Sequence, residues 1–305
     1  MKRVSGLVFI GCLTFSTSLF AQDAPPPDDP AAGGEMPAGE APAGDAVADP
    51  NAMPAEGTPM EEAPPPPPAG GSVTLKKGKI NIQANIEVNL SKEQVGKPIS
   101  IAPDISYGAT DDLTLTLAHS NAALNGFRGG TGFGVCVTGE ENGCGKPYTA
   151  VGLEALYSLV KGPMALGVNV GALGLSRGDM LNHFDAKVGF KGKYTAGKVS
   201  VAFAPSAWIG LNKRDEGNAD LLWIPVGVGV KATPELVVGA ATGLKTPFKE
   251  MADNWTVPIG VSANYAINPQ VGVGGSFVFG TILGAEGKNP GIDSRALHLW
   301  LNYAM

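Results

Sequence analysis

The sequence predicts an all-β protein: a closed, up-and-down antiparallel β-barrel of about twelve strands that spans a membrane. Three observations lead to this prediction. Apolar and polar residues alternate over most of the chain after residue 73, charged residues make up only 16% of the total, and 43 of the 305 residues are Gly. Low charge together with many glycines is typical of a chain whose outer surface is not entirely in water.

The clearest alternation lies in the run from Ile80 to Leu90. Its even-numbered residues are all apolar, and its odd-numbered residues are Asn, Gln or Glu. Successive side chains of a strand point to opposite faces, so this strand has one apolar and one polar face. Eleven residues rise about 36 Å, and a tilt of about 45° brings that length close to the thickness of bilayer hydrocarbon.

The same pattern recurs to the last residue, with short turns and longer connections between the strands. The longest connection is 121–147, and we expect a further link at 177–183. Pro103 and Pro205 lack a donor for the strand ladder, so local bulges are expected there. The expected strands are 79–90, 99–107, 113–118, 151–159, 164–172, 184–194, 199–211, 222–231, 236–245, 255–265, 271–280 and 297–305.

Alternation alone does not say which face meets the solvent, because a soluble barrel hides its apolar face inside. The polar face of these strands is rich in Gly, Ala, Ser and Asn. A water-facing exterior would carry Lys and Glu more densely. Large aliphatic side chains from twelve strands would also overfill an interior, since about eight strands already suffice. We therefore expect the apolar face to meet lipid and the polar face to line the lumen.

Aromatic residues support this orientation. Several of them lie on the apolar parity near strand ends, where an outer-membrane barrel carries aromatic girdles at the two interfaces. The expected girdle residues are Tyr107, Tyr157, Tyr194, Tyr265 and Tyr303 at one rim, with Phe184 and Trp255 at the opposite rim.

Residues 79–305 resemble a bacterial outer-membrane porin-type β-barrel. The resemblance rests on the repeated amphipathic hairpins, the alternation of short turns and long loops, and the closing strand 297–305. It implies an outer-membrane location with lipid as a partner, both chain ends on the periplasmic side, and a passive channel for small polar solutes. The alternative is a non-conducting structural or surface-display barrel that acts through its outer loops or its N-terminal segment.

The first 72 residues precede this barrel. Residues 1–21 are interpreted as a secretory signal peptide, with a basic start and an apolar core; lipoprotein cleavage before Cys12 is the alternative. Residues 22–72 are rich in Pro, Ala and Gly and contain ten acidic residues but no Lys or Arg. We expect a disordered periplasmic spacer here, with a ligand or cell-wall contact as the alternative. The barrel would then comprise residues 73–305.

Charged and titratable residues on the polar parity are candidates for lining the lumen. The acidic ones lie on early strands and the basic ones on later strands, so we expect the two groups to approach opposite walls. One interpretation is a transverse field across a narrow pore that selects solutes by charge. The other is pairing across a plugged lumen. The candidates are Glu87, Asp104, Glu154, Lys187, Lys191, Lys193, Lys231, Lys245 and His298.

Cys136 and Cys144 are eight residues apart in the longest connection. A secreted context favours a disulfide bond over a metal pair, so we expect a bridge that closes this loop.

The sequence offers little evidence for catalysis. His119, Ser120 and Asn121 are residue types used by outer-membrane phospholipases, which resemble this barrel, but adjacent strand residues point to opposite faces. The glycine-rich run 130–134 mimics a phosphate loop without the strand and helix that such a loop needs. There is no zinc-ligand spacing and no basic cluster suited to nucleic acid. We expect no enzymatic activity and no cofactor.

Overall fold

The computed structural model describes residues 71–128, 130–177, 179–287 and 291–305. The expected signal peptide, and the expected spacer apart from residues 71 and 72, lie outside the described residues. No helix within the described part of the chain is long and apolar enough to cross a membrane.

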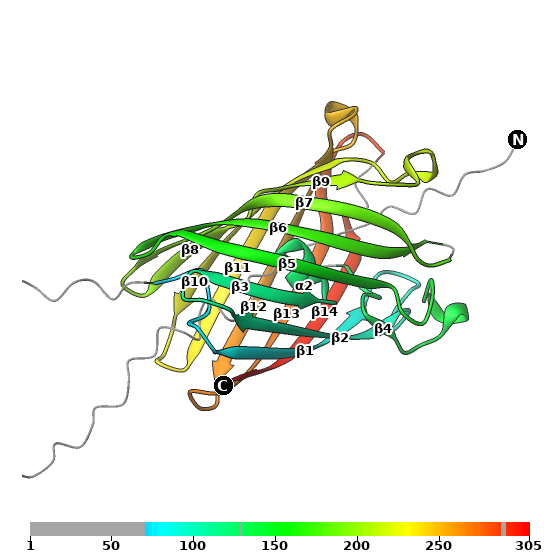
Figure 1. Cartoon of the computed structure of the whole chain (residues 1–305). Coiled ribbons are helices and arrows are strands. Elements are labelled where there is room, and N and C mark those ends of the chain that lie inside the picture. Colours follow the sequence, from blue (N-terminus) through cyan, green and yellow to red (C-terminus); the bar gives the residue numbers. More distant parts are fainter. Residues whose placement is uncertain (1–70, 129, 178, 288–290) are drawn as a thin grey trace, which may run out of the picture. The chain divides into compact units, whose positions relative to one another are not determined.

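Antiparallel strands form a closed ring (Figure 1), in which β1 pairs with β2 on one side and with β14 on the other. A closed ring leaves no unpaired strand edge. The ring strands are β1 (Ile80–Asn89), β2 (Ile99–Gly108), β3 (Leu113–Ala118), β5 (Ala150–Val160), β6 (Met164–Arg177), β7 (Asp179–Ala196), β8 (Val199–Phe203), β9 (Ser206–Gly210), β10 (Leu221–Lys231), β11 (Leu236–Pro247), β12 (Thr256–Ala266), β13 (Val271–Gly284) and β14 (Gly291–Ala304).

Strands β8 and β9 share one position in the ring, because both pair with β7 and β10. The ring therefore has twelve strand positions, and the predicted twelve-stranded antiparallel barrel is confirmed. The short β4 (Val135–Cys136) pairs with β2 and extends the connection between β3 and β5. Single turns of 3-10 helix lie in three connections, at η1 (Glu140–Asn142), η2 (Arg214–Glu216) and η3 (Met251–Asp253).

The two ends of the barrel differ, and we name them by their connections. The turn rim is the end where β1 begins and β14 finishes; Ile80 and Met305 exchange backbone hydrogen bonds there. The loop rim is the opposite end. The turn rim carries the connections 109–112, 161–163, 197–198, 232–235 and 267–270, and the loop rim carries 90–98, 119–149, 211–220 and 248–255.

Burial along the strands follows the alternation in the sequence. In β10, Trp223, Gly227 and Gly229 are buried while Val226 and Val228 between them are exposed. Exposed apolar side chains continue around the ring, well beyond the patch size expected on a soluble monomer. This outward band includes Ile86, Ile105, Leu115, Leu153, Val170, Val188, Ile224, Val261 and Leu299.

The two prolines differ in effect. The predicted strand 199–211 is divided into β8 and β9 at Ala204 and Pro205, although the Pro205 carbonyl still accepts a hydrogen bond from the Phe190 amide. The bulge expected at Pro103 is absent, because β2 keeps an unbroken register with β1 through the pair Ala84 and Pro103. On its other side β2 pairs with β3 only as far as Ile105, so the missing donor interrupts no ladder.

The link predicted at 177–183 is wrong. Strands β6 and β7 continue as one long hairpin to the pair Arg177 and Asp179, and His183 lies inside it opposite Leu175. The polar run that suggested a loop keeps the strand alternation, with His183 buried and Phe184 exposed.

The connection between β3 and β5 is more than a surface loop. It begins with the short helix α2 (Asn121–Asn125), most of whose residues are buried, and Figure 1 shows α2 within the ring of strands. The connection between β3 and β5 therefore enters the lumen.

Candidate functional site

A segment of the β3–β5 connection fills the middle of the lumen. We call it the plug and define it as residues 121–128 and 130–133. Its helix is specified locally: Ser120 caps the N-terminus by accepting the Ala123 amide at 3.0 Å, and Gly126 ends the helix with φ of 70°. Ser and Gly are preferred at these two positions. The backbone is thereby turned back toward the barrel wall.

One carboxylate holds both ends of the plug. Glu87 on β1 accepts the Asn121 amide at 2.9 Å and the Phe133 amide at 3.2 Å, and its side chain is fully buried. The Ser100 hydroxyl on β2 also donates to Glu87, at 3.3 Å. A buried carboxylate is stable only when such donors surround it. Glu87 therefore acts as a clamp on the plug.

Asp104 on β2 holds the residues that lead into the plug. It accepts the backbone amides of His119 at 2.8 Å and Ser120 at 2.9 Å, and the Ser120 hydroxyl at 2.5 Å. The Asn85 side-chain amide on β1 donates to the same carboxylate at 2.9 Å. The Ser120 hydroxyl is thus committed to this carboxylate and to the helix cap, and the His119 ring bonds the Pro103 carbonyl at 2.5 Å.

Glu154 on β5 forms a buried ion pair with Lys187 on β7. The two charged groups are 2.5 Å apart, and Lys191 lies 3.1 Å from the other carboxylate oxygen. Lys187 also donates to the Leu124 carbonyl of the plug at 2.5 Å. The expectation that acidic and basic groups face each other from opposite walls is wrong here, because only β6 separates the strands that carry them.

Aromatic contacts reach the far side of the lumen. The Phe127 ring packs edge-on against Trp223 of β10 with 5.6 Å between centroids, in a cluster with Val278 of β13. The Arg128 guanidinium remains near β1: it donates to the Asn85 side chain at 3.0 Å and lies 3.4 Å from the ring centre of Trp300 on the adjacent β14. One hydrogen bond joins Trp223 to the Asn125 carbonyl, at 2.8 Å. The plug therefore contacts the wall on both sides of the lumen.

Apolar side chains also lie on the inner face, although the sequence predicts that the polar face of the strands lines the lumen. Leu173 and Leu175 of β6 and Trp208 of β9 pack with Leu124 and Phe133 of the plug. These inward leucines are the signal that sequence reasoning missed, since an apolar residue on the polar parity needs something to pack against it.

A second inward segment lies at the turn rim. We call residues 71–77 the strap. Val73 packs with Leu156 and Ala165, and the Leu75 amide donates to the Thr114 hydroxyl at 2.8 Å. Leu156, which breaks the sequence alternation, is thus covered by Val73.

A cavity of about 60 Å³ separates the strap from the plug, lined by residues of both segments and by Asp104, Glu154 and Lys191 of the wall. That volume holds several water molecules.

The remaining lumen candidates lie along the inner face but do not meet in one cluster. Lys193 is buried near the turn rim, Lys231 is half-buried at the end of β10, and Lys245 is half-buried on β11 opposite Trp223. His298 is buried on β14, in register between Glu87 and Ser276. A role for these residues in a conducting lumen stays a prediction.

Six of the seven expected girdle residues, the five tyrosines and Phe184, are exposed on the outer face of the strands. The five tyrosines lie near the turn rim with 42–52% of their surface exposed, and Phe184 is 46% exposed nearer the loop rim. Trp255 lies just before β12 and is half-buried. Rings exposed in this way on an apolar band fit the interface of a bilayer.

Cys136 and Cys144 form a disulfide bond, with 5.8 Å between their Cα atoms. Cys136 belongs to β4, directly after the plug, and β4 is paired to the loop end of β2. The glycine-rich run 130–134, which resembles a phosphate loop in sequence, allows close packing in the structure. A side chain at Gly130 would meet Asn121, and one at Gly134 would meet the backbone of β2.

Comparisons with known proteins identify the fold. No protein-family model matches the chain, and no curated protein matches it. Among solved structures, the NanC porin is 8% identical, and the alignment covers 73% of this chain and 98% of that one with a TM-score of 0.50. The KdgM porin is 8% identical with coverage of 73% and 98% and a TM-score of 0.46. An outer-membrane channel from Pseudomonas putida F1 is 13% identical with coverage of 76% and 97% and a TM-score of 0.47. The fold is that of an outer-membrane porin-type barrel.

Proposed function

We propose that this chain is a bacterial outer-membrane protein whose barrel is a passive channel for small polar solutes. The observation that carries the proposal is the small, polar character of the inner face of β11 to β13. The plug is tied mainly to one part of the wall, while the facing part, β11 to β13, presents small polar residues such as Ser262 and Ser276. A barrel that served only as a scaffold has no need of such a polar, side-chain-poor inner face.

The outer surface supports the membrane location. An apolar band with tyrosines along one rim matches the surface that a bilayer covers. In this proposal residues 1–21 are the signal peptide, residues 22–72 are a periplasmic spacer, and residues 73–305 are the barrel. An even number of strands puts both ends of the barrel on one side. The turn rim is then periplasmic, because short turns face the periplasm in such barrels.

The experiment is a planar-bilayer recording with the purified, folded protein, together with liposome swelling in small sugars. The proposal expects discrete conductance steps and measurable sugar entry. Folded, inserted protein that gives neither result would contradict it.

A second candidate is the non-conducting barrel. The extent of the plug favours it, because plug residues contact the wall at β1, β7, β10 and β14. In that case the barrel would act through its outer loops or its N-terminal spacer, and no solute would enter the liposomes. Neither candidate involves a catalytic step or a cofactor.

A further inference from the structure

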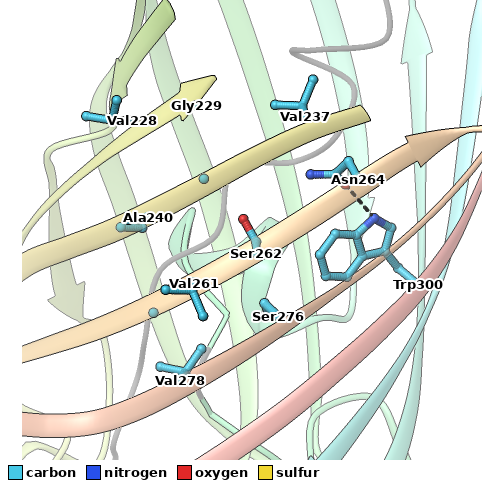
Figure 2. Close-up of a pocket in the computed structure, with 13 residues that line it drawn as sticks. Val228, Gly229, Val237, Ala240, Val261, Ser262, Asn264, Ser276, Val278 and Trp300 are labelled. Atoms are coloured by element: carbon cyan, nitrogen blue, oxygen red, sulfur yellow. Dashed lines mark hydrogen bonds between the residues drawn. The ribbon is translucent and has the colours of Figure 1, made fainter. Parts of the chain in front are cut away.

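A small cavity lies against the inner face of β11 to β13 (Figure 2). Its volume is about 20 Å³, which is room for about one water molecule or one hydroxyl group of a solute. Two glycines of the wall keep this space open. A Cβ at Gly239 would lie 3.3 Å from the Ser262 hydroxyl oxygen, and one at Gly260 would lie 3.0 Å from a Val278 methyl carbon. A side chain at either glycine would therefore crowd the cavity.

One hydroxyl group that lines the cavity has no partner among the described residues. The Ser276 side chain on β13 is only 4% exposed, and its oxygen makes no hydrogen bond. A buried hydroxyl group that is left unpaired is unfavourable. Such a group in a folded protein points to a water molecule or a ligand that supplies the missing bond.

The amide group of Asn264 on β12 is oriented by Trp300. The indole N–H donates to the Asn264 side-chain oxygen at 2.9 Å, and the amide nitrogen lies on the side away from the ring (Figure 2). The ring is itself held in place, because it lies directly over Gly274 and the Arg128 guanidinium is 3.4 Å from its centre. The oxygen of Asn264 is thus engaged, and its two N–H donors are presented in a fixed direction.

The spacing of the polar groups decides between water and a larger ligand. Ser262 and Asn264 are two residues apart on β12, so their side chains point to the same face of the strand. Positions with this spacing are about 7 Å apart along a strand. One water molecule cannot bridge that distance, whereas two hydroxyl groups of one solute can. Ser276, the partner of Ser262 in the ladder of β12 and β13, adds a third group beside them.

We infer that Ser262, Asn264 and Ser276 form a subsite that binds hydroxyl groups of a short polyol or sugar in the lumen. This inference rests on the proposed channel function, which brings such a solute into the lumen. One hydroxyl group of the solute completes the hydrogen bonding of Ser276, and the amide of Asn264 donates to another. The subsite recognises hydroxyl groups and sets no condition on the net charge of the solute.

The test measures binding in detergent micelles by NMR of the tryptophan indole N–H groups. The Trp300 signal is assigned by its absence in W300F, and it reports on the subsite because Trp300 bonds Asn264. The short polyol erythritol is titrated into the native chain, into S276A and into the control S158A. Ser158 is a matched control, since its buried hydroxyl on β5 also has no partner among the described residues and lies outside the cavity.

Native protein and S158A should show a shift of the Trp300 signal that saturates with erythritol. In S276A the half-saturating concentration should rise by at least about fivefold, the loss expected for one hydrogen bond. The S276A protein should fold normally, because the substitution removes only an unpaired hydroxyl group. Dimethoxyethane, whose methylated oxygens donate no hydrogen bond, should give no saturable shift with the native chain.

Three results would overturn the inference and leave a cavity that holds water only. They are a shift that does not saturate, the same half-saturating concentration in S276A and native protein, and an equal response to dimethoxyethane. Planar-bilayer recording of the same proteins separates these results from failure of the channel. Conductance without binding that depends on Ser276 leaves the channel and removes the subsite. Binding that depends on Ser276 in a protein without conductance supports the subsite and overturns the channel.

Discussion

The two halves of the barrel wall have the same backbone architecture and opposite interiors. Strands β1 to β7 direct Glu87, Asp104, Glu154 and Lys187 inward, where these groups bind each other, the plug or the residues leading into it. Strands β11 to β13 direct mainly Gly, Ser and Ala inward. The difference teaches that inward charge in this barrel marks where an internal segment is held.

The largest expected effect is on the buried ion pair. Replacing Lys187 by Met leaves Glu154 with Lys191 alone as its cation and should lower the free energy of unfolding by about 3–5 kcal/mol. Adding E154Q to K187M should recover part of that loss. Ser262→Ala on the inner face of β12 should change the free energy of unfolding by less than about 0.5 kcal/mol. Urea unfolding in detergent measures all four proteins, and equal losses for K187M and S262A would remove the contrast between the halves.

A smaller loss is expected at the clamp. Glu87→Gln keeps one acceptor for two buried amides, so the free energy of unfolding should fall by about 1–3 kcal/mol. Hydrogen exchange at the Asn121 and Phe133 amides should speed up more than exchange in the strands. Glu235→Gln, in an exposed turn, is the matched control. Unaltered exchange at both amides would mean that Glu87 does not hold the plug.

The strap offers a test at the turn rim. A side chain at Gly108 would lie 2.1 Å from the Lys76 carbonyl oxygen, so Gly108→Val should push the strap away from the wall. Val73→Cys reports this change, because residue 73 is buried in the native chain and should react with a thiol reagent only after displacement. Gly145→Ala, with no atom near its added carbon, is the control. Equal labelling of Cys at position 73 in both backgrounds would argue against a seated strap.

The smallest expected effect lies in the connection 211–220. Arg214 bonds the Asp220 carboxylate at 2.9 Å and 2.7 Å, and this hydrogen bonding lowers the pKa of Asp220. A lowered pKa contributes stability above the ordinary Asp value of about 3.9, and that contribution is lost as the pH falls through the lowered pKa. Carboxyl-carbon NMR should show a higher midpoint for Asp220 in R214Q. Identical midpoints would show that the pair does not shift the titration.

The barrel was predictable because strand alternation is a repeated, local signal. Within runs such as 80–90, the alternation alone shows which residues share a face of the strand. Twelve such strands predict a closed barrel. The hairpin of β6 and β7 was underestimated because polar residues near Arg177 look like a loop, yet a strand accepts them on its inward face. Pro103 was harmless because its missing donor falls where the neighbouring strand has ended.

The plug was harder to predict because its determinants are long-range. Ser120 and Gly126 are local signals for the start and the end of a short helix. No local sequence signal indicates that this helix lies inside the barrel. Leu173 and Leu175, which point inward, were an indirect sign of a segment inside the barrel, because they pack against the plug. The positions of Glu87 and Asp104 on the inner face followed from parity, whereas their partners did not, because backbone amides from a distant loop leave no pattern in the sequence.

The most direct measurement asks which part of the lumen solutes use. Single-channel current is recorded while a small thiol reagent is added to S262C, on the inner face of β12, and to N169C, on β6 beside Glu154. The account predicts that the reagent reduces the current through S262C and leaves the current through N169C unchanged. Block at residue 169 with no effect at residue 262 would contradict it.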